Sequence, residues 1–90
     1  MDLLSKVKQN ANIAFRVIGD EALIVNPKDG LIYPLNPTAT RVWQLLDGQK
    51  NCGEIIEAID AEFEGEKVSL GQDVLDFIES LLKENLAVCC

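Results

Sequence analysis

The residues able to carry chemistry in this 90-residue chain are fifteen Asp and Glu and three Cys, and His is absent. The lack of His removes the commonest general base at neutral pH and the commonest metal ligand. A general acid–base pair needs two carboxylates in contrasting environments beside a cleft. The spacing of the carboxylates is that of solvated helix faces, so we predict no catalytic residue.

The three cysteines are Cys52, Cys89 and Cys90. Structural zinc is held by four ligands at spacings such as C-x2-C, and adjacent Cys residues chelate one metal poorly. Lys50 is the one basic residue close to Cys52. We therefore predict neither a metal site nor a cofactor. Thiol redox chemistry or metal handling by these three residues is the alternative function.

The balance of charge restricts the partners. Eight Lys and Arg against fifteen Asp and Glu give a net charge of −7, and phosphate repels such a domain, which disfavours nucleic acid and anionic membranes. A hydrophobic content of 48% fits a small folded domain better than an acidic disordered tail. The N-terminus lacks the apolar segment of a signal peptide, and no apolar run could span a bilayer. We expect a cytoplasmic protein.

The first half of the chain has strand periodicity. Residues 1–10 are predicted to be a frayed arm or one loose turn, and Ile13, Phe15 and Val17 then alternate with other residues as in a half-buried strand. Two further strands follow at 22–25 and 31–35, after turn signals at Gly19-Asp20 and Pro27–Gly30.

From Asn36 the apolar period becomes 3.6 residues, which predicts three amphipathic helices and a short extended piece at 86–90. The helix starts are Asn36-Pro37, Asn51 with Glu54, and Ser69 with Gln72. The helix ends are Asp47-Gly48, Gly65 and Asn85. The predicted fold is α+β and winged-helix-like, a three-stranded antiparallel meander followed by three helices.

The third strand is the feature with the clearest functional meaning. Pro34 cannot donate to a ladder, so this strand belongs at a sheet edge, with the face of Leu35 toward the core. Unpaired N–H and C=O groups at an edge accept an added peptide strand. Pro34 could equally serve only to protect the edge against aggregation.

The segment LIYPLNPTATRVWQLLDG at 31–48 resembles the PqqD family, with its strand ending in Leu-Asn, its Thr-Ala helix start and its Asp-Gly stop. The similarity continues through 54–59 and 73–78 and covers about 12–88. It divides the chain into an N-terminal arm at 1–11, a PqqD-like peptide-binding domain at 12–88 and a tail at 89–90. Asn85 stands where the family usually has Gly.

The resemblance implies a non-catalytic module that binds the leader of a ribosomally synthesised precursor peptide as an added strand beside the third helix. Such modules present the precursor to a modifying enzyme, often a radical S-adenosylmethionine protein, as in pyrroloquinoline quinone biosynthesis. The expected peptide-binding residues are Leu31, Ile32, Tyr33, Pro34, Leu35, Leu75, Asp76, Phe77, Glu79 and Lys83. A winged-helix DNA-binding regulator is a weaker alternative, because Lys83 is the only basic residue of the third helix.

The apolar arc of the third helix has Val74, Ile78 and Leu81 at its middle, so these three should be core. Leu75 and Phe77 lie on opposite flanks, and one flank should line the peptide groove; the sequence leaves open which. Asp73, Asp76 and Glu79 should set up a negative field along this groove.

Overall fold

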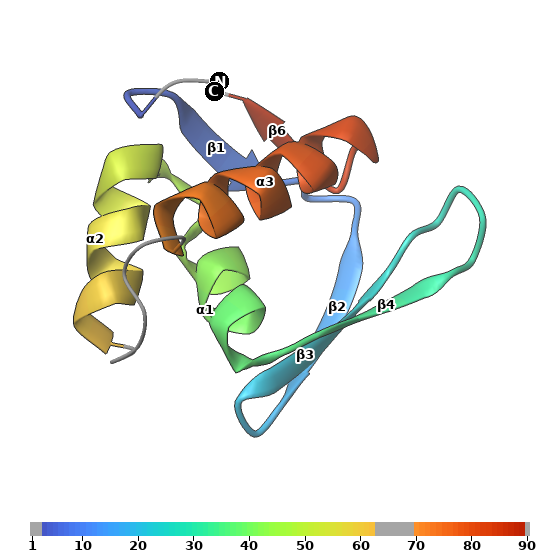
Figure 1. The fold of residues 1–90 in the computed structure, drawn as a ribbon. Helices are drawn as coiled ribbons and strands as arrows, with labels where there is room; N and C mark the ends of the chain where they lie inside the picture. Colours follow the sequence, from blue (N-terminus) through green and yellow to red (C-terminus); the bar gives the residue numbers. More distant parts are fainter. Residues whose placement is uncertain (1–2, 63–69, 90) are drawn as a thin grey trace.

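The computed structural model describes residues 3–62 and 70–89, which form three helices and two three-stranded antiparallel sheets (Figure 1). The mixed α+β class is therefore confirmed. In this part of the chain, no helix is long and apolar enough to cross a membrane.

The predicted meander is present as one sheet with the strand order β2-β3-β4. It consists of β2 (Ala14–Ile18), β3 (Glu21–Val25) and β4 (Ile32–Leu35). Gly19 and Gly30 both adopt positive φ, of 64° and 72°, in the two connecting turns. The turn residues thus impose the backbone that these tight connections require.

The second sheet has the order β5-β1-β6 and was only partly expected. It contains β1 (Lys6–Gln9), β5 (Asp47–Asn51) and β6 (Ala87–Cys89). The prediction of a frayed arm was wrong for Lys6–Gln9, because this segment pairs with two distant strands and buries Val7 completely. The strand β5 was missed, since its sequence DGQKN has little strand propensity and pairing with β1 overrides it. The extended piece after residue 86 is confirmed as β6.

The helices are α1 (Pro37–Leu45), α2 (Cys52–Glu62) and α3 (Leu70–Lys83). Asn36 caps α1 by accepting the Ala39 N–H at 2.8 Å. Asn51 and Glu54 form the reciprocal capping box, with N···O distances of 2.8 and 2.9 Å. The predicted Ser69–Gln72 capping box and the stop at Gly65 lie outside the described residues.

The end of α3 also follows the prediction. Asn85 has a φ of 59°, and the Leu86 N–H donates to the Leu81 carbonyl oxygen at 2.8 Å. The Asn85 N–H donates to the Leu82 carbonyl oxygen at 3.1 Å, which completes a Schellman motif. This cap directs the chain back into β6 and leaves Leu86 buried.

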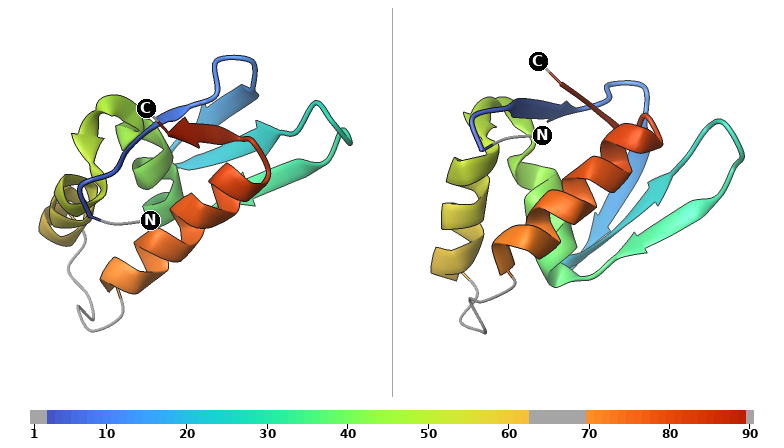
Figure 2. Two further views of the ribbon diagram at one scale, coloured as in Figure 1. Left: turned by 90° about the horizontal axis from the view of Figure 1, so that it is seen from above. Right: turned by 45° about the horizontal axis from the view of Figure 1, so that its top comes forward.

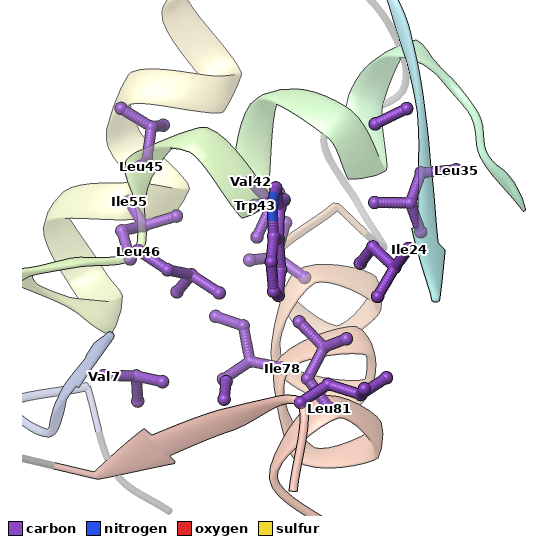
Figure 3. Packing of buried hydrophobic residues seen from close by; sticks show 14 of the residues in the cluster. Val7, Ile24, Leu35, Val42, Trp43, Leu45, Leu46, Ile55, Ile78 and Leu81 are labelled. Carbon is purple, nitrogen blue, oxygen red and sulfur yellow. The ribbon is translucent and has the colours of Figure 1, made fainter. Parts of the chain in front are cut away.

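The core is centred on Trp43, which is fully buried (Figure 3). It receives residues from both sheets and all three helices, among them Val7, Ile24, Ile55 and Ile78. The expectation of a half-buried β2 was wrong in part. Phe15 and Val17 stay 44% and 38% exposed, because β2 is an outer strand and α1 packs mainly against β3 and β4.

Candidate functional site

The free edge of β4 lies at one end of its sheet, and β4 pairs with β3 alone among the described strands. The Asn26 N–H donates to the Leu31 carbonyl oxygen at 2.9 Å. Hydrogen-bonded and non-hydrogen-bonded pairs alternate along an antiparallel ladder, which turns the backbone of Ile32 and Pro34 to the free edge. Since Pro34 has no N–H, the edge offers one donor, from Ile32, and two carbonyl acceptors.

Leu31 lies outside this edge although its side chain is 55% exposed. Its N–H donates to Asp29 Oδ1 at 2.9 Å, and its carbonyl oxygen accepts the Asn26 N–H. Both backbone groups therefore serve the turn between β3 and β4. The edge that can pair with an added strand begins at Ile32.

A cavity of about 240 Å³, which we call the strand–helix cavity, opens between β4 and α3. Its walls are mainly apolar, with polar groups from Ser80 of α3 and from Glu84, directly after this helix, at one side. Its lining residues are Ile24, Tyr33, Pro34, Leu35, Phe77, Ser80, Leu81, Glu84 and Leu86. Alternate side chains of a strand added to β4 would face this cavity.

The helices α1 and α3 lie next to each other (Figure 2). A second cavity of about 360 Å³, the helix–helix cavity, lies between the start of α1 and α3. Its lining residues are Asn36, Thr38, Ala39, Val42, Asp73, Val74 and Phe77. Phe77 lines both cavities, so together they form one groove along α3. At a rise of about 1.5 Å per residue, the segment from Asp73 in α3 to Glu84, directly after the helix, is about 16 Å long, the length of about five strand residues.

The structure shows which flank of α3 lines the groove. Val74, Ile78 and Leu81 are 3%, 0% and 4% exposed, which confirms the predicted core positions. Phe77 is half-buried and faces the groove, whereas Leu75 packs against the core and lines neither cavity. The groove is thus on the Phe77 flank.

The charged residues expected at the site lie on a neighbouring stripe of α3. Asp76, Glu79 and Lys83 are exposed and line neither cavity, and Asp76 accepts a hydrogen bond from the Gln72 side chain at 2.8 Å. The carboxylates at the groove belong to Asp73 and Glu84.

Ser80 and Glu84 escaped the sequence analysis as groove residues. With Asp73 and Phe77 they form a stripe at spacings of four, three and four residues, which places them on one helix face. This period was the signal that could have found them. It becomes usable only when Phe77 is known to face the groove.

The positions of the two described cysteines do not indicate a site for thiol chemistry. Cys52 is fully buried in the core, and Cys89 is exposed on β6. Within residues 3–62 and 70–89, no three His, Cys, Asp or Glu residues are grouped so that they could hold a metal ion. The thiol hypothesis gains no support from this arrangement.

Residues 21–87 match the family model described as "Coenzyme PQQ synthesis protein D (PqqD)". The chain belongs to the PqqD family. The matched segment includes β3, β4 and all three helices, and hence both walls of the groove. No match is found among curated proteins.

Two solved structures resemble this PqqD-family chain. The structure of TbiB1 in complex with the TbiA(beta) leader peptide has 28% sequence identity and a TM-score of 0.75, covering 89% of this chain and 93% of that one. The heterocyclase TruD has 9% identity and a TM-score of 0.65, covering 96% of this chain and 12% of that one. The second similarity concerns the fold alone.

Proposed function

We propose that this PqqD-family chain binds the leader of a ribosomally synthesised precursor peptide as a strand added to β4 and presents it to a modifying enzyme. Family membership and the similarity to a leader-peptide complex support this function. The observation that carries the proposal is the free β4 edge beside an apolar groove of matching length.

Binding would combine backbone pairing with side-chain burial. The Ile32 N–H and the carbonyl groups of Ile32 and Pro34 supply three hydrogen bonds, each worth about 0.5–1.5 kcal/mol net. Inward leader side chains enter the strand–helix cavity between Tyr33 and Phe77. Backbone pairing supplies affinity without sequence preference, and the cavity selects apolar side chains at alternate leader positions.

In this proposal the chain binds and orients, and the enzyme supplies the chemistry. Asp73 and Glu84 are exposed carboxylates, one at each end of the groove. Their charge attracts Lys or Arg at the two ends of the bound leader segment and acts mainly on the association rate. A radical S-adenosylmethionine enzyme acting on a peptide is the kind of partner that such a module serves.

The test first searches the open reading frames adjacent to the gene for this chain for a short precursor peptide. Titration of its leader into the ¹⁵N-labelled protein should shift backbone amide signals in β4 and along residues 73–84. Shifts confined to α2 or to the β5-β1-β6 sheet would contradict strand addition at β4.

A matched pair of variants tests the backbone hydrogen bonds. Ile32→Pro and Ile32→Ala both remove the side chain, and only Pro removes the edge donor. Pro is tolerated at the first residue of an edge strand whose N–H faces outward. Ile32→Pro should therefore bind the leader about 2- to 10-fold more weakly than Ile32→Ala, the effect of one hydrogen bond. Equal affinities would exclude this donor from recognition.

A further inference from the structure

The sheet β2-β3-β4 has a second face, which is directed away from the helices (Figure 1). We call it the outer face. Strand register and alternation place five apolar residues larger than Ala on it, and no described helix or strand packs there. They are Ile18, Leu23, Val25, Ile32 and Pro34. Ile18 and Ile32 are 57% and 60% exposed, and Leu23 and Val25 are each 36% exposed.

The outer face is hollowed at the end near the turn between β2 and β3. This hollow has a volume of about 210 Å³, and Ile18, Leu23 and Pro34 contribute to its lining. Glu21 also lines it. Its size suits one aliphatic or aromatic side chain from a partner. A concave apolar site that no described element covers is a candidate contact point for a partner.

Arg16 lies on the same face, opposite Leu23 in the neighbouring strand. Within the described part of the chain, the two ion pairs are those of Arg41 with Glu62 and Lys50 with Asp47, so Arg16 is left to solvent. Arg16 is at the middle of β2, an end strand of this sheet, and its positive charge favours a partner that brings a carboxylate to this point.

The area of the outer face indicates whether it could form a stable dimer interface or only part of a larger contact. Three strands about 4.8 Å apart and five residues of about 3.4 Å each cover about 240 Å². A lasting protein–protein interface buries about 800 Å² on each partner. A dimer formed through this face alone would therefore have too small an interface to be stable. The face fits one part of a larger, reversible contact.

The outer face is continuous with the edge that would receive the leader. A strand added to β4 turns every second side chain to the outer side, next to Ile32 and Pro34. The loaded domain then has a four-stranded outer face, one strand of which is the leader. A protein that contacts both components recognises the loaded domain in preference to the empty one.

We propose that the outer face, extended by the outward side chains of the bound leader, is the docking surface for the modifying enzyme. The enzyme contributes an apolar side chain to the hollow and a carboxylate to Arg16. This inference rests on the proposed function. It adds that leader binding itself completes the surface that the enzyme recognises.

The test uses the precursor peptide and the modifying enzyme that a search of the adjacent open reading frames identifies. The double variant Ile18→Thr, Leu23→Thr removes apolar surface and places residues of high β-propensity at both positions. Leu4→Thr is the control, because Leu4 is 79% exposed and lies before β1, outside this sheet. Fluorescence of the single Trp, Trp43, confirms folding of each variant in urea. Arg16→Glu tests the charge without removing apolar surface.

The double variant should bind the leader within twofold of wild type and bind the enzyme about tenfold more weakly, with a matching fall in kcat/KM. Arg16→Glu should weaken enzyme binding by a similar factor, and Leu4→Thr should change neither affinity.

Enzyme affinity within twofold of wild type in the double variant would overturn the docking surface and leave the proposed function standing. An equal loss of leader affinity would assign the face to the leader itself. A wild-type dimer in sedimentation, lost in the double variant, would assign it to a second copy. Failure of the wild-type domain to bind the leader would refute the proposed function instead.

Discussion

Phe77 offers the sharpest test of the groove, because it lines both cavities while Leu75, on the opposite flank of α3, lines neither. Both side chains are half-buried and pack against the core. Truncation to Ala should therefore destabilise the domain by a similar amount in each case, about 1–2.5 kcal/mol, roughly half of the cost in a full core. Only Phe77→Ala should also weaken leader binding.

The expected loss follows from the area that the ring shares with the leader. About 50 Å² of ring and an equal area of leader side chain, at about 25 cal/mol per Å², give about 2.5 kcal/mol. Partial collapse of the groove around the smaller side chain reduces this to about 1 kcal/mol at the lower limit. Phe77→Ala should then raise the leader Kd by about 5- to 70-fold.

The assay separates stability from binding. Urea unfolding followed by Trp43 fluorescence reports the free energy of unfolding, since Trp43 is fully buried and is the only Trp. Anisotropy of a labelled leader, at a temperature where both variants are folded, reports the Kd. Phe77→Leu retains an apolar side chain and should recover most of the affinity. Equal leader affinities for Phe77→Ala and Leu75→Ala, after equal losses of stability, would refute the assignment of the groove to the Phe77 flank.

Two further predictions concern charge. Glu84→Gln should slow leader association about threefold at low salt, and this effect should disappear near 1 M salt. The control variant Glu79→Gln, on the neighbouring stripe, should change the association rate less. Stopped-flow association rates that are equal for the two variants, or independent of salt, would exclude this electrostatic role of Glu84. The pKa of Asp47 is lowered to about 2, first by the hydrogen bond from the Lys50 side chain and then by the Gln49 N–H. The stabilisation by the Asp47 carboxylate is complete above about pH 4 and is lost as the pH falls to 2. In urea titrations, Asp47→Asn should therefore be less stable than wild type at pH 7 and nearly equal to it at pH 2. A difference in the free energy of unfolding that stays constant with pH would contradict this assignment.

Local chemistry in the sequence was sufficient for the meander, the starts of α1 and α2 and the end of α3. The positive φ of Gly19, the cap formed by Asn36 and the left-handed Asn85 each depend on groups within a few residues. The edge position of β4 could be predicted for the same reason, since Pro34 lacks a donor wherever the strand lies. Together these signals determined the α+β class and identified the strand that we propose pairs with a leader.

Tertiary structure decided which segments meet over long distances in the chain. The strands β1 and β5 have polar sequences, and they form because they pair with each other and β1 also pairs with β6, about 80 residues away in sequence. The periodicity of α3 placed Leu75 and Phe77 on opposite flanks, but packing against β4 and α1 selected Phe77, and with it Ser80 and Glu84, for the groove. A helical period fixes the relative directions of side chains, and only the neighbouring elements determine which direction is covered and which stays open to a ligand.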